Sequence, residues 1–200
     1  MVDWAAGAVI WQRGDEGAAM VARLAGRVKL TLISPAGREL ILRQCESGES
    51  FGELALFDGA PRLADAVAVE PARGAVLTRA AFRDLSARHP DLPLAALAYL
   101  SGMVRATTDR LETIALYQLQ ARLARFFLLS LQALHGPEVP AGAGLRLAVT
   151  QGELAAMLGA SRPKINRALQ ALRELGAVAD EGAVWRFDPA LLATEAEREV

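Results

Sequence analysis

From Gly7 to about Thr78 the chain carries short apolar or alternating runs, separated by glycine at near-regular spacing. The runs are residues 8–11, 20–24, 28–33, 39–43, 67–69 and 75–77. The segments between them, among them Arg13–Gly17, Ser34–Gly37, Glu46–Gly48 and Pro71–Gly74, are rich in residues that favour turns. Short strands at this spacing predict an antiparallel sandwich or roll.

Helical periodicity replaces this pattern after Thr78. Residues 78–87 predict a small helix that ends at His89-Pro90, because the residue before a proline avoids helical backbone. A long helix follows from about Leu92 to Leu134, either continuous or interrupted once, with Asp91 as its cap. Apolar residues at three–four spacing approximate a coiled-coil seam along it: Leu97, Leu100, Val104, Leu111, Ile114 and Ala115.

Thr107 and Thr108 interrupt this seam. Polar groups on an otherwise apolar face need partners. Two hypotheses stay open: the hydroxyls bond to backbone carbonyls of their own helix, or they meet a polar ligand at a dimer axis.

The second half of the long helix carries another apolar series. We expect these residues to pack against a C-terminal domain: Leu119, Leu123, Phe126, Phe127, Leu131 and Leu134. The segment 135–144 has the glycine and proline content of a connector, and Arg146–Val149 predicts a strand that enters the domain.

Residues 150–163 contain the start signals of two helices. Thr150 and Glu153 have the spacing of a capping box, so a helix should begin at Gln151. Gly159 ends it, because glycine accepts the left-handed backbone of a tight turn. Ser161 then offers its hydroxyl as the cap of a second helix, and Pro163 fits the first turn of that helix.

The second helix has two chemically different faces. Its apolar stripe consists of Ile165, Ala168, Leu169, Leu172 and Leu175, whereas Pro163, Asn166, Arg167 and Gln170 face the other way, flanked by Arg162 and Arg173. The segment from Ser161 to Arg173 has four basic residues and no acidic one. Arginine, asparagine and glutamine match the edges of guanine and adenine in the major groove. This pattern favours a DNA-reading helix over a helical hairpin whose charges only keep it soluble.

A wing is predicted after this helix. Residues 177–180 and 183–187 read as two strands around Glu181-Gly182, a tight hairpin turn. Trp185 is expected to pack within the wing rather than to contact DNA.

The roll has one interruption that a simple meander does not need, at residues 48–62. Glycines at 48, 52 and 59 let backbone approach a bound group, and Gly52-Glu53-Leu54-Ala55 can open a short helix whose amide end attracts an anion. Arg62 could clamp a phosphate and Glu53 could accept from a sugar hydroxyl. A helix-capped loop with one surface arginine is the competing hypothesis.

Composition narrows the function class. The chain has 200 residues, is 52% hydrophobic and has a net charge of −1, which allows one or two packed domains and a local basic patch. The single cysteine, Cys45, excludes an internal disulfide and a cysteine-rich metal site. His89 precedes a proline at a predicted helix end, His135 lies beside Gly136 in the predicted connector, and Cys45 has no evident base partner, so we expect no catalytic or metal-binding residues. Without a signal peptide or a membrane-spanning apolar run, we expect a cytoplasmic protein that does not bind membranes.

Together these motifs resemble the cyclic-AMP receptor protein and fumarate and nitrate reduction regulator (Crp/Fnr) family of bacterial transcription regulators. The resemblance rests on the glycine-punctuated roll, Phe51–Phe57 with Pro61-Arg62, the long helix and the segment Gly159–Arg167. It implies an α+β fold with an N-terminal antiparallel β-roll of the cyclic-nucleotide-binding jelly-roll type, a long dimerisation helix and a C-terminal winged helix-turn-helix. The expected domains are residues 1–90, 91–135 and 145–200.

The resemblance also implies site residues. Glu53 looks like the ribose-binding residue, Arg62 like the phosphate clamp, and Thr107 and Thr108 fall where the family has its adenine-contacting pair. The expected effector site is Gly52, Glu53, Leu54, Arg62, Leu63, Thr107 and Thr108. The expected DNA-binding residues are Thr150, Ser161, Arg162, Pro163, Lys164, Asn166, Arg167 and Gln170.

Three departures from the family pattern bear on the ligands. Leu63 stands where cyclic-AMP binders have a small or hydroxyl residue, and Asp65 adds a negative charge near the expected anion. Pro163 replaces a glutamate, so the operator should differ at one base pair by roughly 1–3 kcal/mol of discrimination. The cysteine cluster of the oxygen-sensing branch is absent, so no iron–sulfur cluster is expected.

The implied function is a homodimeric regulator that binds palindromic double-stranded DNA. Cyclic AMP or a related cyclic nucleotide is the candidate effector, although a regulator that binds DNA without an effector stays open. RNA polymerase is a further candidate partner. The alternative is a cyclic-nucleotide sensor whose helix-turn-helix contacts protein rather than DNA.

Overall fold

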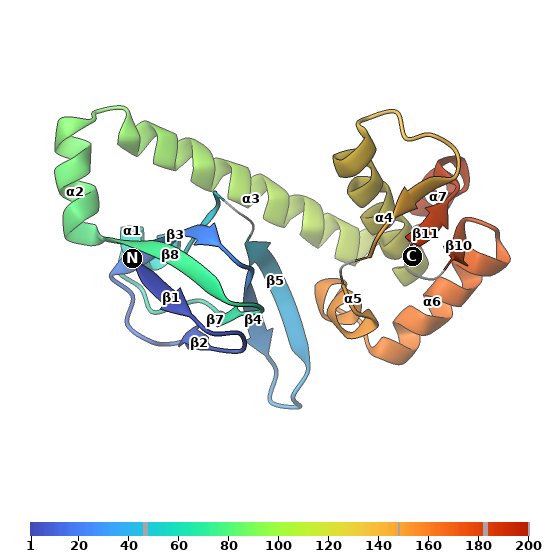
Figure 1. Ribbon diagram of the computed structural model, residues 1–200, viewed down its shortest axis with the longest axis horizontal. Coiled ribbons are helices and arrows are strands. Elements are labelled where there is room, and N and C mark those ends of the chain that lie inside the picture. Colours follow the sequence, from blue (N-terminus) through green and yellow to red (C-terminus); the bar gives the residue numbers. More distant parts are fainter. Residues whose placement is uncertain (46–47, 148, 182–183, 200) are drawn as a thin grey trace. The chain divides into compact units, whose positions relative to one another are not determined.

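The computed structural model describes residues 1–45, 48–147, 149–181 and 184–199. The chain divides into two compact units, Met1–Met103 and Val104–Val200. In Figure 1 the first runs from blue to green and contains most of the strands, whereas the second runs to red and is mainly helical.

The first unit contains two four-stranded sheets. The strand orders are β1-β8-β3-β6 and β2-β7-β4-β5, and the neighbours that pair are antiparallel. The strands are β1 (Val2–Trp4), β2 (Val9–Trp11), β3 (Ala19–Ala25), β4 (Val28–Ile33), β5 (Glu39–Cys45), β6 (Ser50–Phe51), β7 (Asp65–Ala68) and β8 (Ala72–Thr78). The expected antiparallel roll is therefore confirmed.

Alternating side chains build the core of this unit. Val21, Val28, Phe51, Ala66 and Ala68 are buried together, and each lies on the inward face of its strand. The strands approach so closely that a Cβ on Gly74 of β8 would lie 2.4 Å from Cγ1 of Val21. Only a glycine fits there without displacing the core.

One predicted turn needs correction, and two strands were missed. Pro71–Gly74 is not a turn, because Ala72–Gly74 already belong to β8, where they pair with β1. The strands β1 and β6 were not predicted, since three and two residues are too short to show a period. Of the expected turn Glu46–Gly48, Glu46 and Ser47 lie outside the described residues.

The predicted long helix is two helices. After α2 (Arg79–Arg88), capped by the Thr78 hydroxyl, come α3 (Leu92–Leu116) and α4 (Leu119–His135). At the break the backbone pairs with the end of the chain: Tyr117 forms a bridge with Glu199, and the Gln118 amide donates to the Arg198 carbonyl at 3.3 Å. These partners replace helical hydrogen bonds, which is why the helix is interrupted there.

The core of the second unit forms around α4. Leu123, Phe127 and Leu131 are fully buried and pack with residues of α5 (Gln151–Met157), α6 (Arg162–Glu174) and α7 (Pro189–Ala196). The prediction for this apolar series was wrong only at Leu134, which is 61% exposed because it lies in the last turn of α4.

A three-stranded sheet of order β10-β11-β9 completes the second unit. Its strands are β9 (Ala143–Leu145), β10 (Val178–Glu181) and β11 (Val184–Phe187), and β10 and β11 form the expected antiparallel wing. Glu181 of the predicted turn is instead the last residue of β10, whereas Gly182, and Ala183 after it, lie outside the described residues.

The strand predicted at Arg146–Val149 lies instead at Ala143–Leu145, and Ala148 is outside the described residues. The register explains the shift. Ala143 pairs with Phe187 and Leu145 with Trp185, so Val184, where β11 begins, is the last possible partner and the pairing cannot continue past Arg146.

Candidate effector pocket and nucleic-acid interface

The short helix predicted at Gly52 is present as α1 (Glu53–Asp58), and it places the first group of candidate residues. Gly52 precedes it with φ at 82°, in the left-handed region that favours glycine. A Cβ on Gly52 would lie 2.5 Å from Nη1 of Arg62 and 2.8 Å from Cη2 of Trp11. Gly52 is thus required both by its backbone angle and by the close approach of these two side chains.

Arg62 is buried within the first unit. The side chain is only 8% exposed, and its guanidinium carbon lies 3.9 Å from the centre of the Trp11 ring. Nη1 donates to the Gly52 carbonyl at 3.0 Å, whereas Nε is buried without a hydrogen-bond partner. Burial lowers the pKa of Arg62, and Asp15 and Glu53 oppose that shift. Arg62 is therefore a buried cation anchored at the start of α1, not the surface arginine of the competing hypothesis.

Glu53, the first residue of α1, is 2% exposed. One carboxylate oxygen lies 3.7 Å from Nη1 of Arg43, and the other, Oε2, is buried without a hydrogen-bond partner. Burial raises the pKa of Glu53 and outweighs Arg43 and Arg62, which lower it. A buried carboxylate oxygen without a partner is suited to accept a hydrogen bond from a hydroxyl of a ligand.

Arg43 was not predicted as part of this site. It lies on β5 and donates to the Ser50 carbonyl, to the Tyr99 hydroxyl at 3.1 Å and to the Met103 sulfur at 3.8 Å. The Tyr99 hydroxyl in turn donates to the Ser50 carbonyl at 3.2 Å. Arg43 lies two residues before the buried Cys45 in regular register with β4, so this two-residue period was the available signal that Arg43 faces inward.

The remaining effector candidates are more exposed. Leu54 is 40% and Leu63 60% exposed, so the leucine that departs from the family pattern points largely to solvent. Asp65 accepts from the Arg13 amide at 2.6 Å. Thr107 and Thr108 are exposed residues of α3 in the second unit, and the Thr108 hydroxyl donates to the Val104 carbonyl at 2.9 Å. The structure thus brings Gly52, Glu53 and Arg62 together within the first unit.

The helix-turn-helix forms as its local signals predict. The Glu153 amide donates to the Thr150 hydroxyl at 3.2 Å and the Thr150 amide to the Glu153 carboxylate at 2.7 Å, which completes the capping box of α5. Gly159 has φ at 64° in the turn. Ser161 is at the cap position of α6, but its side chain makes no capping hydrogen bond, so that part of the prediction was wrong.

The recognition helix α6 separates its faces clearly. Ile165, Ala168, Leu169 and Leu172 are buried, but Leu175, predicted in the same stripe, is 47% exposed because it caps the end of the helix. The opposite face is exposed and carries Arg162, Pro163, Lys164, Asn166, Arg167 and Gln170. Gln170 donates to the Glu174 carboxylate at 3.0 Å. The exposed side of α6 can therefore present guanidinium, ammonium and amide groups to an acceptor-rich surface.

Trp185 is half-buried against the core of the second unit. Its ring centre lies 6.2 Å from that of Phe127, and the Arg173 guanidinium lies 5.1 Å from it. This position agrees with packing within the wing.

The described ranges contain neither a candidate metal cluster nor a candidate membrane-spanning helix. No group of three or more His, Cys, Asp or Glu residues there could hold a metal ion. No helix among these residues has the length and apolarity to cross a bilayer. His135 contacts the Gly144 carbonyl at 3.0 Å, and Cys45 is a buried free thiol.

Comparisons with known proteins match both units to described families. Residues 1–89 match the cyclic nucleotide-binding domain, and residues 121–194 match the Crp-like helix-turn-helix domain. The chain is 30% identical over 183 residues to the CRP-like cAMP-activated global transcriptional regulator of Mycobacterium tuberculosis, covering 90% of this chain and 80% of that protein. It is 32% identical to the cyclic AMP receptor protein of Thermus thermophilus, covering 86% and 76%.

A solved structure extends this likeness to three dimensions. A Crp/Fnr-family transcriptional regulator from Thermus thermophilus superposes with a TM-score of 0.75 at 27% identity, over 100% of this chain and 99% of that one. The similarity therefore covers the roll, the helices and the winged helix-turn-helix together.

Proposed function

Because the chain belongs to the Crp/Fnr family of transcription regulators, we propose that it binds a palindromic DNA site as a homodimer, with α6 in the major groove. The observation that carries this proposal is the exposed face of α6. It combines three basic residues, Arg162, Lys164 and Arg167, with Asn166 and Gln170, and the segment from Ser161 to Arg173 has no acidic residue. Arg167 lies in the middle of that face, where a bidentate contact with guanine is feasible.

The exposed apolar surface of α3 supports the proposed dimer. None of its 25 residues is buried within a single chain, and its apolar residues Leu97, Val104 and Leu111 are 60–65% exposed. Long apolar stripes on a helix are stable in water when a second helix covers them. Two copies joined along this seam would carry two α6 helices, as a palindromic operator requires.

The effector in our proposal is a cyclic nucleotide bound in the roll. Arg62 supplies a buried cation and Glu53 a buried carboxylate oxygen that no hydrogen bond uses. Arg43 and Tyr99 offer a path from this site to α3, since both contact the Ser50 carbonyl and Tyr99 belongs to α3. A ligand that engages Glu53 competes with Arg43 and so changes how α3 is held. We place this regulation in the cytoplasm, with RNA polymerase as a further partner.

One pair of variants tests the DNA-binding role. Arg167→Ala removes one exposed arginine side chain from α6, and Arg88→Ala removes another exposed one from the end of α2. We expect Arg167→Ala to weaken binding of a palindromic operator, obtained by selection from a random DNA pool, by about 1–3 kcal/mol, roughly 5- to 150-fold. We also expect it to relax preference at one base pair per half-site. Equal DNA affinity and preference for the two variants in fluorescence anisotropy would refute the assignment of this face.

A further inference from the structure

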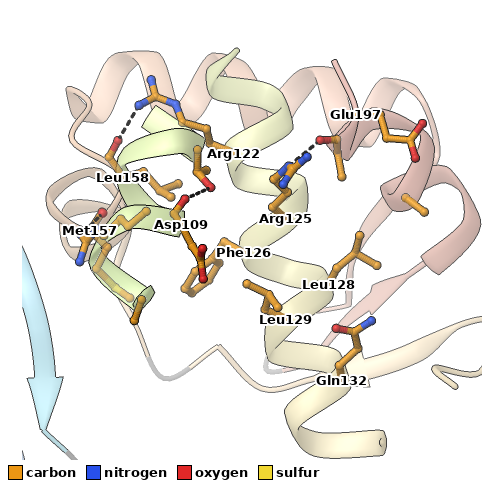
Figure 2. A pocket seen from close by; sticks show the side chains of 15 residues that line it. Asp109, Arg122, Arg125, Phe126, Leu128, Leu129, Gln132, Met157, Leu158 and Glu197 are labelled. Carbon is orange, nitrogen blue, oxygen red and sulfur yellow. Dashed lines mark hydrogen bonds between the residues drawn. The ribbon is translucent and has the colours of Figure 1, made fainter. Parts of the chain in front are cut away.

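The second unit contains a cavity whose lining includes no residue of α6 and none of the first unit. Its volume is about 770 Å³, within the range of roughly 300–1,000 Å³ typical of small-molecule sites. Figure 2 shows side chains converging on it from the second half of α3, from α4, from the end of α5 and from α7. The apolar part of its wall includes Phe126, Leu128, Leu129, Met157 and Leu158.

Three arginines give this cavity its charge. Arg110 donates to the Met157 carbonyl, Arg122 to the Leu158 carbonyl at 3.2 Å, and Arg125 to the Ala196 carbonyl at 2.7 Å. The acceptors of Arg122 and Arg125 are neutral backbone carbonyls, so they orient these two guanidiniums without cancelling their charge. Burial lowers the pKa values of Arg110 and Arg122, and Nε of Arg122 is buried without a hydrogen-bond partner.

The other polar groups of the lining do not offset this charge. Asp109 and Glu197 are its two acidic residues, and both are exposed to solvent. Thr113 and Gln132 contribute neutral groups, and the Thr113 hydroxyl already donates to the Asp109 carbonyl at 2.8 Å. Three cations against two hydrated acids leave a net positive cavity with an apolar wall.

The expected dimer seam does not cover this cavity. Ala106, Asp109, Arg110 and Thr113 line it, whereas Val104, Leu111 and Ile114 belong to the seam. At about 100° per residue, the mean directions of the two sets are about 140° apart around α3. A second copy packed along the seam therefore leaves the cavity open.

We propose that this cavity binds a small organic anion with an apolar body, such as a short acyl chain or an aromatic ring that bears one acidic group. The acidic group lies among Arg110, Arg122 and Arg125, and the apolar body lies against Phe126 and Leu129. This division follows the usual design of ligand sites, in which apolar walls give affinity and a few charged groups give orientation.

Octanoate, 1-octanol and octylammonium test the proposal, because they share a chain length and differ in charge. Each is titrated as a competitor of 1-anilinonaphthalene-8-sulfonate, itself an apolar anion, on the full-length protein, with fluorescence as the readout and without DNA or cyclic nucleotide. We expect octanoate to bind most tightly and octylammonium least. Octanoate that binds no better than octylammonium would overturn the proposal.

Variants of Leu129 locate the binding. Leu129→Glu places a negative charge at the cavity, and Leu134→Glu makes the same change on α4 outside the lining; the two leucines are 66% and 61% exposed. We expect Leu129→Glu to weaken octanoate binding about tenfold or more through like-charge repulsion, while Leu134→Glu and Leu129→Lys retain it. Equal losses for the two glutamate variants, or no loss in Leu129→Glu, would refute the site. Neither outcome depends on whether the roll binds a nucleotide.

Discussion

Replacing Gly52 with alanine should destabilise the first unit more than the same substitution at Gly37. Both glycines have left-handed backbone, with φ at 82° and 75°. A Cβ on Gly37 meets nothing within 4 Å, whereas on Gly52 it lies 2.5 Å from Nη1 of Arg62 and 2.8 Å from Trp11. The two substitutions therefore share the backbone strain and differ in the displacement of Arg62.

The magnitude follows from the contacts that must move. Left-handed backbone costs an alanine about 1–2 kcal/mol, and this applies to both variants. At Gly52 the shift also weakens a hydrogen bond from a charged donor, about 1.5–3 kcal/mol, and a desolvated cation–π contact, about 2 kcal/mol. Gly52→Ala should thus exceed Gly37→Ala by about 2–5 kcal/mol.

Urea unfolding measured by tryptophan fluorescence tests this prediction. In a Trp185→Phe background the emission comes from Trp4 and Trp11, which both belong to the first unit. The difference in unfolding free energy between the two variants is the quantity of interest. Equal losses would mean that Arg62 and Trp11 are not held against Gly52, and our description of the pocket would then be wrong.

Three further predictions concern single side chains. Since burial raises the pKa of Glu53, the folded state favours its protonated form, so Glu53→Gln should raise the unfolding free energy at neutral pH. This gain should shrink as the pH falls through the raised pKa and vanish below the ordinary value of 4.5; a pH-independent difference in urea midpoints would contradict it. Thr150→Ala should destabilise the second unit by about 1 kcal/mol through loss of the capping box, measured by circular dichroism against Thr194→Ala, whose hydroxyl bonds only to the Ala190 carbonyl. Arg62→Ala should weaken cyclic-AMP binding at least about tenfold in calorimetry, and unchanged affinity would remove Arg62 from the effector site.

The helix-turn-helix was predictable because its signals are local. Each signal acts within a few residues, and each is present: the Thr150–Glu153 capping box, the left-handed Gly159 and the division of α6 into a buried and an exposed face. The failures at Ser161, Leu134 and Leu175 occur at helix ends, where tertiary contacts and fraying override a periodic pattern.

The effector pocket was less predictable because its contacts join distant parts of the chain. Trp11 meets Arg62, and Arg43 meets Tyr99, although neither pair is close in sequence. The break at Tyr117 depends on the end of the chain in the same way. The walls of the cavity in the second unit likewise come from segments that no local motif connects.

Selection of bound duplexes from a random DNA pool, with and without cyclic AMP, tests the central claim most directly. We expect the full-length protein to enrich one palindromic sequence, with enrichment greater in the presence of the nucleotide. The same palindrome at equal enrichment in both arms would contradict gating by cyclic AMP while leaving dimeric DNA binding intact. No enriched sequence in either arm would contradict the claim that α6 reads DNA.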